Sequence, residues 1–115
     1  MKQTISNALK HYGIPAHILG HQYIGYAVEL VMEDSSIMHQ ITKRLYPAVA
    51  KHFNTTGSRV ERAIRHAVEV AFDNLKPDII YEAFGNTISA TKGKATNTQF
   101  IAMLVEHLSN SEVAV

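Results

Sequence analysis

Residues 58–75 read SRVERAIRHAVEVAFDNL, and this stretch decides the fold. Its apolar side chains recur every three or four residues, which is the period of a helix with one buried face. Ser58 and Glu61 are three residues apart and fit a capping box, which predicts that Ser58 caps the helix. The stretch therefore predicts a helix over 58–75 with one face anchored in a core. The anchoring residues are Val60, Ile64, Ala67, Val68, Ala71 and Leu75.

The opposite face of this helix carries long polar side chains over its first two turns. At about 100° per residue, Arg62 lies opposite Val60, and Arg65 and His66 lie near Arg62. Glu61 lies on one flank of the same face. An anchored helix that presents two arginines to solvent is suited to reading another molecule.

A shorter helical pattern precedes this one. Residues 46–53, YPAVAKHF, place Val49 and Phe53 on an inward face. Residues 54–57, NTTG, are turn formers that tolerate left-handed backbone or cap helices. A short helix, a tight turn and a second helix with polar residues on its first two turns form a helix-turn-helix. The sequence predicts this motif at about 46–75.

Positive charge is concentrated on the predicted motif. Residues 43–66 contain six lysines or arginines and one acidic residue, a net charge of +5. Since the whole chain carries +1, the other residues carry a net −4. Such a distribution indicates a polyanionic partner. The plainer alternative is a solvated helix face, because charge clusters alone are common.

Helical periodicity recurs along the rest of the chain, and no convincing strand appears. Residues 14–20 and 87–95 are expected as connectors, and 109–115 as a frayed tail. These patterns predict the all-α class, as a six-helix single domain over residues 1–115 that contains the helix-turn-helix. The expected helices are 3–12, 22–33, 37–53 with a kink or break at Tyr46-Pro47, 58–75, 78–84 and one that starts after Thr96.

Two further caps are expected. Ser35 or Ser36 can cap the helix that follows, and Thr96 forms a capping box with Gln99, three residues on.

Several classes of chemistry are excluded. The chain has no cysteine, so we expect no disulfide and no thiolate metal site. His17 and His21 have a metal-binding spacing, but no third ligand lies near them in the sequence. Lys94 follows a glycine, but Ala95 stands where a P-loop needs Ser or Thr. No stretch approaches the about 20 apolar residues of a membrane span. We expect no metal, no cofactor, no membrane contact and no enzymatic activity.

The polar face suggests base recognition. An arginine fork can donate to guanine O6 and N7, which provides about 1–3 kcal/mol of discrimination. Arg62 and Arg65, three residues apart, can address neighbouring base pairs or opposite strands. Glu61 can accept from cytosine N4 or orient an arginine, and His66 is a fourth candidate.

Other residues suit phosphate contacts. Backbone N–H groups and the helix dipole favour an anion at a helix N-terminus, where Ser58 and Arg59 lie. The remaining candidates are Lys51 and Thr55 across the turn, and Lys92 and Lys94 in the long loop. For Lys92 and Lys94, a position in solvent without any DNA contact is an equal alternative.

The stretch LYPAVAKHFNTTGSRVERAIRHAVEVAF, residues 45–72, resembles the helix-turn-helix core of the sporulation stage-zero master regulator family, in its C-terminal effector domain. The resemblance extends to YGIPAHILGHQY (12–23) and to ITKRLYP (41–47). It also includes FGNTIS (84–89) and KGKATNTQFIAML (92–104).

The resemblance implies an all-helical domain that binds a short DNA box upstream of promoters in endospore-forming bacteria, activating some genes and repressing others. It implies Glu61, Arg62 and Arg65 as the base readers, and it fits a box with a G·C-containing centre flanked by A·T pairs. A cytoplasmic, nucleoid-associated bacterial protein is expected.

Family members normally carry an N-terminal phosphoacceptor receiver domain that controls dimerisation. Such a domain is absent here, so the chain is either an isolated effector domain or a receiver-less relative. The resemblance implies head-to-tail pairing on tandem boxes, with a monomer expected in isolation. It also implies that the segment after the helix over 58–75 contacts the polymerase sigma factor, through Ile79, Phe84 and Ile88.

The alternative is a helical protein-interaction module that has kept the fold without reading DNA, with a partner on residues 78–84. Glu61, Arg62 and Arg65 together favour DNA binding, because an interaction module gains nothing from this trio.

Overall fold

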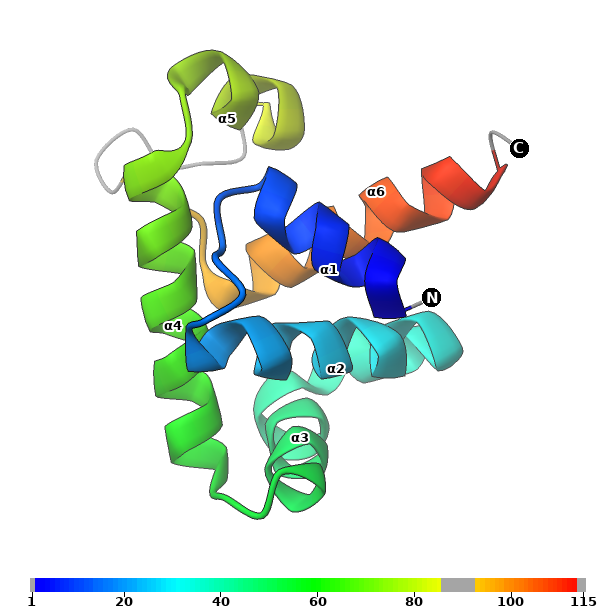
Figure 1. Cartoon of the computed structure of the whole chain (residues 1–115). Helices are drawn as coiled ribbons and strands as arrows, with labels where there is room; N and C mark the ends of the chain where they lie inside the picture. The colour runs from blue at the N-terminus through cyan, green and yellow to red at the C-terminus, as the bar shows by residue number, and fades with distance from the viewer. Residues whose placement is uncertain (1, 86–92, 114–115) are drawn as a thin grey trace.

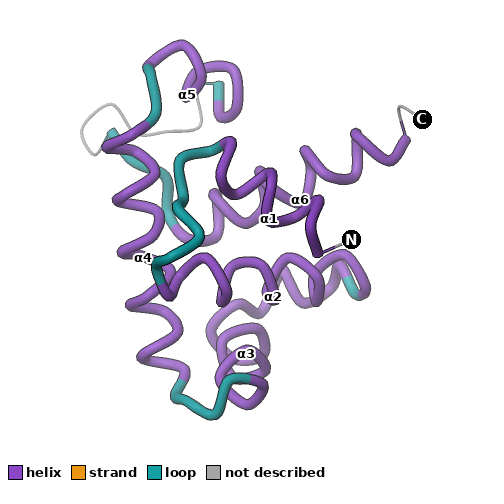
Figure 2. The backbone as a smooth tube through the Cα atoms, in the orientation of Figure 1, coloured by secondary structure: helices purple, strands orange, loops and turns teal. Residues whose placement is uncertain are grey.

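Helices make up most of the chain that the structure describes (Figures 1 and 2). This structure is a computed structural model that describes residues 2–85 and 93–113. No strand occurs among these residues, so the all-α prediction is confirmed. In chain order the helices are α1 (Lys2–His11), α2 (Leu19–Glu33), the 3-10 helix η1 (Ser35–Gln40), the π-helix η2 (Ile41–Leu45), α3 (Tyr46–His52), α4 (Gly57–Asn74), α5 (Pro77–Phe84) and α6 (Asn97–Val113).

The core surrounds α2, which contacts α1, α3, α4 and α6 (Figure 1). Ile24 and Val28 of α2 are fully buried, as are Ile64 of α4 and Phe100 of α6. Each such side chain contributes about 1.5–3 kcal/mol by leaving water. The predicted inward stripe of residues 58–75 is confirmed from Val60 to Ala71, and Leu75 at its end is half-buried.

Gly20 is the point at which α2 meets the middle of α4. A Cβ atom built on Gly20 would lie 2.5 Å from both the Ala63 carbonyl oxygen and the Ala67 Cβ of α4. Only a residue without a side chain allows this approach. The prediction of a connector up to Gly20 was therefore wrong, because α2 begins at Leu19 and the glycine serves helix packing.

The segment before the helix-turn-helix forms a 3-10 helix and then a π-helix. Asp34, and not Ser35 or Ser36 as predicted, caps η1, because its carboxylate accepts from the Ser36 N–H at 3.1 Å. The hydrogen bonds from Ser36 hold the pKa of the Asp34 carboxyl below its ordinary value. The predicted break at Tyr46-Pro47 is confirmed, since η2 ends at Leu45 and α3 begins at Tyr46. The Tyr46 N–H bonds to the Ile41 carbonyl, five residues back. This wider turn makes room for Pro47, whose ring would clash inside a regular α-helix.

Three aromatic rings join α4, α5 and α6. The Phe84 ring centroid lies 5.5 Å from that of Phe72 and 5.9 Å from that of Phe100. Phe84 is only 6% exposed. These rings fix α5 at the C-terminal end of α4, about 27 Å from its N-terminus given 18 residues.

The start of α6 follows the predicted capping box. The Thr96 N–H donates to Gln99 Oε1 at 2.8 Å, and the Gln99 N–H donates to Thr96 Oγ1 at 3.1 Å. The predicted frayed tail from Ser109 was wrong over most of its length, because α6 extends to Val113. Most of the predicted loop 87–95 lies outside the described residues.

Candidate nucleic-acid interface

The turn between α3 and α4 redirects the chain within four residues. Asn54 adopts a left-handed conformation with φ of 55°, which asparagine tolerates better than most residues. The Thr55 N–H then donates to the Ala50 carbonyl at 2.9 Å, which closes the end of α3. The two helices therefore meet through a fixed turn at one end of the domain (Figure 2).

The cap of α4 is Thr56 and not Ser58 as predicted. Thr56 has extended backbone, and its hydroxyl accepts from the Arg59 N–H at 3.2 Å. Ser58 is the second residue of the helix, since α4 begins at Gly57. The left-handed Asn54 turns the chain early enough for Thr56 to reach the cap position. Arg59 then takes the third helical position, so Glu61 is too far along for a capping box.

Replacement of the cap tests this correction. Thr56→Ala should lower the free energy of unfolding by about 1 kcal/mol, because the Arg59 N–H loses its acceptor. Ser58→Ala removes a hydroxyl of similar exposure on the same turn and should change it by less than about 0.5 kcal/mol. Urea unfolding followed by circular dichroism measures both values. A larger loss in Ser58→Ala than in Thr56→Ala would restore the original assignment.

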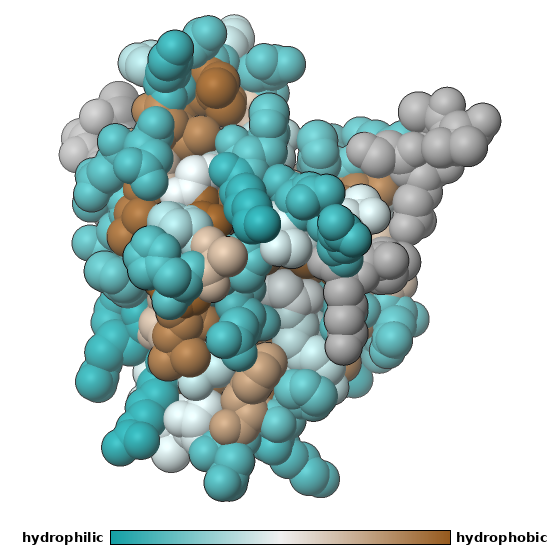
Figure 3. All heavy atoms as spheres, in the orientation of Figure 1, coloured by the Kyte–Doolittle hydropathy of each residue, from teal (hydrophilic) through white to brown (hydrophobic). Residues whose placement is uncertain are grey.

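The polar face of α4 is exposed as predicted. Arg62, Arg65 and His66 are exposed and Glu61 is half-buried, while Val60 on the opposite side of the helix is fully buried. Arg62 forms no ion pair with the described part of the chain. Figure 3 shows mostly hydrophilic residues over the lower part of α4, towards α3. The helix is therefore anchored on one side and open on the other.

Arg65 differs from Arg62 because it already has a partner within the chain. Its guanidinium lies 3.5 Å from Glu61 Oε1, one turn earlier on the same helix. The Arg65 side chain is 56% exposed. An exposed pair of this kind contributes little to stability, so a competing ligand could separate it at small cost.

The candidate phosphate residues fall into two groups. Lys51, Ser58 and Arg59 are exposed near the turn, and Thr55 beside them is half-buried. Lys94 lies 3.8 Å from Glu69 Oε2 on α4. Lys92 lies outside the described residues.

A side-chain tie that sequence reasoning missed links α6 to the helix-turn-helix. Asn97 Nδ2 donates to the Tyr46 hydroxyl oxygen at 3.0 Å and to the Glu61 carbonyl at 3.2 Å. Helical periodicity carries no signal for such a contact, because it joins residues 51 and 36 positions apart.

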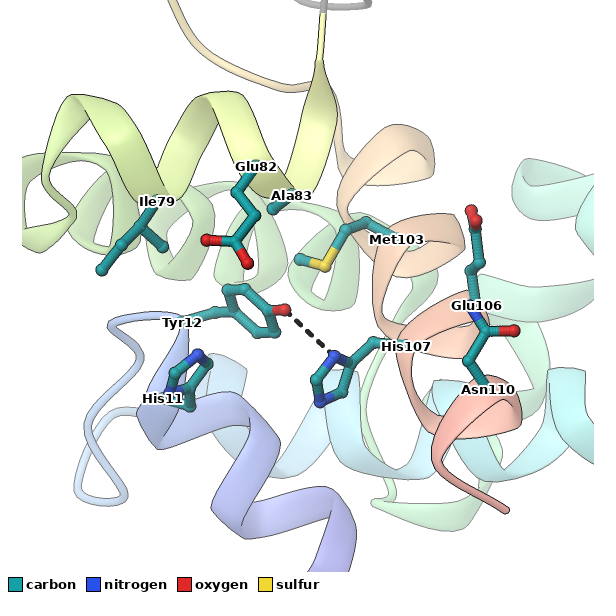
Figure 4. Close-up of a pocket in the computed structure, with 9 residues that line it drawn as sticks. All are labelled: His11, Tyr12, Ile79, Glu82, Ala83, Met103, Glu106, His107 and Asn110. Carbon is teal, nitrogen blue, oxygen red and sulfur yellow. Dashed lines mark hydrogen bonds between the residues drawn. The ribbon is translucent and has the colours of Figure 1, made fainter. Parts of the chain in front are cut away.

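A cleft at the other end of the domain lies between α1, α5 and α6 (Figure 4). The Tyr12 hydroxyl and His107 Nδ1 are hydrogen-bonded across it at 3.1 Å. The His11 and His107 rings are stacked with centroids 6.3 Å apart. Glu82 of α5 also lines the cleft. These contacts tie α1 to α6 far from the polar face of α4.

Two buried phenols predict a loss of stability at alkaline pH. Burial raises the pKa of Tyr12 and of Tyr46 above the ordinary value of 10.0, and in Tyr12 the Glu82 carboxylate adds to the rise. A raised pKa means that the folded protein holds the proton more tightly. This contribution is fully present below pH 10 and is lost as the pH rises through the folded-state pKa.

We expect the free energy of unfolding to fall between about pH 9 and about pH 11. The fall should be smaller in Tyr12→Phe/Tyr46→Phe, which has neither phenol. Urea unfolding at the two pH values measures this. An equally steep decline in the double variant would contradict the prediction.

The expected partner surface on α5 requires a correction. Phe84 packs into the core between Phe72 and Phe100. It therefore anchors α5 to the core and has too little exposed surface to contact a partner. Ile79 is half-buried, and Tyr81 is 66% exposed. Hydrophobic residues are visible at the α5 end of the molecule (Figure 3). Ile88 lies outside the described residues.

A short helix, a fixed turn and an anchored second helix with an open basic face define a helix-turn-helix DNA-binding domain. Residues 5–108 match the family model described as "Sporulation initiation factor Spo0A C terminal". This match spans most of the chain, and the chain belongs to that family. The family is the DNA-binding effector domain of a sporulation response regulator and acts in transcription regulation; it is not an enzyme family.

The described residues offer neither a metal-binding cluster nor a membrane-spanning helix. No group of three or more histidine or acidic side chains is placed to hold a metal ion there. None of the described helices combines the length and the apolar character that crossing a bilayer requires.

Proposed function

We propose that this domain reads a specific sequence in duplex DNA, with the first two turns of α4 in the major groove. The observation that carries the proposal is the exposed Arg62 beside Arg65 on a helix whose opposite face is fully buried. In this proposal both arginines donate to guanine, Glu61 orients Arg65 or accepts from cytosine, and His66 contacts the edge of the site. The box has a G·C-containing centre flanked by A·T pairs.

Phosphate contacts hold the helix in register. Lys51, Thr55, Ser58 and Arg59 surround the N-terminus of α4 and suit one DNA strand, where backbone N–H groups also favour an anion. Lys94 suits a second contact, and exchanging Glu69 for a phosphate would cost little because both side chains are exposed. Lys92, nearby in sequence, has the same proposed role.

Two further partners belong to the proposal. The exposed Tyr81 and half-buried Ile79 of α5 support a contact with the RNA polymerase sigma factor. Membership of this family supports head-to-tail pairing on tandem boxes. We propose that the isolated domain is a monomer.

Selection from a randomised duplex pool, followed by mobility shifts with the selected box, tests this function. We expect a preference over random duplex that survives competitor DNA, and an affinity that falls steeply with salt. Binding that is equal for selected and random duplex at every salt concentration would contradict sequence reading. No binding at low salt would leave the interaction module as the better explanation.

A further inference from the structure

One side-chain amide connects both helices of the helix-turn-helix. Asn97 is the first residue of α6, and its Nδ2 carries two hydrogens. Its two acceptors are the Tyr46 hydroxyl oxygen at 3.0 Å and the Glu61 carbonyl at 3.2 Å. Tyr46 begins α3, and Glu61 lies one turn into α4. A shift of α4 against α3 would therefore stretch one of these bonds.

One of the two acceptors belongs to a proposed base-reading residue, Glu61. Glu61 is bonded to Asn97 through its main chain and paired with Arg65 through its carboxylate at 3.5 Å. Tyr46, Glu61, Arg62 and Arg65 line one hollow between η2, α3 and α4. Tyr46 itself is 7% exposed, so its ring is fixed by packing and its hydroxyl offers Asn97 a stationary acceptor.

The start of α6 is itself held firmly. The Thr96–Gln99 capping box fixes the turn from which Asn97 projects. The Asn97 amide is therefore held in place and couples the position of α6 to the first two turns of α4.

We infer that Asn97 is a positioning residue for base recognition, which sets the angle at which the first two turns of α4 present Arg62 and Arg65 to the groove. This inference rests on the proposed function. Base contacts need placement within about 0.5 Å, whereas lysine contacts to phosphate tolerate more movement. Loss of the tie should therefore reduce selectivity and leave electrostatic binding intact.

The test compares affinities for the selected box and for random duplex. In Asn97→Ala the ratio of the two should fall about tenfold, with random-duplex affinity and the salt slope unchanged. Tyr46→Phe removes one of the two acceptors and should lower the ratio less. The double variant should be no worse than Asn97→Ala alone, because both changes remove the same tie.

Asn74→Ala is the matched control. Asn74 Nδ2 donates to the Gly13 carbonyl at 3.2 Å, so the same kind of tie is removed from the far end of α4. The control should lose thermal stability and keep its selectivity ratio within about twofold.

An Asn97→Ala protein that keeps the wild-type ratio overturns the inference. So does a control whose ratio falls as far as that of Asn97→Ala, because general loosening would then explain both. A wild-type protein without any preference overturns the proposed function instead, which separates the two failures.

Discussion

Gly20→Ala should lower the free energy of unfolding by about 2–3 kcal/mol. The added methyl would lie 2.5 Å from the Ala63 carbonyl oxygen and from the Ala67 Cβ. Neither neighbour can turn away, since one is backbone and the other is a side chain with no rotatable bond. The two helices must separate, and apolar contacts between them are lost. Urea unfolding at neutral pH measures the change.

Gly25→Ala is the control for this prediction. Gly25 lies on the same helix, but its added Cβ would be 3.8 Å from Ile5 and Leu9, which is ordinary contact. Alanine is also favoured over glycine within a helix by about 0.5–1 kcal/mol. Gly25→Ala should therefore be neutral or stabilising. A similar loss in both variants would show that Gly20 is not a site of close packing.

Local patterns predicted the reading helix well. Its inward residues repeat within one helix, so the prediction required no knowledge of what they contact. The sequence also predicted the break before Pro47 and the Thr96–Gln99 box, because backbone chemistry within a few residues determines both. The N-cap was misplaced by two residues because Thr55, Thr56 and Ser58 all offer an acceptor. The left-handed Asn54 decides between them.

Contacts between distant segments could not be predicted in this way. Gly20 looked like a turn residue because its packing role exists only once α4 lies against α2. Asn97 looked like part of a helix start, and its acceptors on α3 and α4 are far away in sequence. The family resemblance placed Phe84 on a partner surface, but its contacts with Phe72 and Phe100, which exist only in the folded domain, bury it. In each case the structural role of the residue depends on contacts that form only in the tertiary structure.

Arg62→Ala should weaken binding to the selected box by about 1–3 kcal/mol and relax the preference at one base pair. Arg62 is exposed and has no ion pair in the described part of the chain, so its loss should change stability by less than about 0.5 kcal/mol. Repeating the pool selection with the variant identifies the base pair whose preference is lost.

Lys51→Ala provides the contrast, since Lys51 is exposed beside the turn and is proposed to contact phosphate. It should weaken selected and random duplexes alike and reduce the salt slope by about 0.9. Equal effects of the two substitutions on all sequences would count against base reading by Arg62. Arg62→Lys sharpens the comparison because it keeps the charge and removes the planar fork. Full recovery in Arg62→Lys would assign Arg62 to phosphate.

Arg65 should respond differently from Arg62 because of its ion pair. Arg65→Ala removes a donor and also leaves the Glu61 carboxylate, formerly 3.5 Å from the guanidinium, without that partner. An unpaired carboxylate in the groove repels phosphate, so binding to every duplex should weaken in addition to the lost preference. Glu61→Gln in the Arg65→Ala background should restore the affinity for every duplex but not the lost base preference. Arg62→Ala should gain nothing comparable from Glu61→Gln, because Arg65 still neutralises that carboxylate.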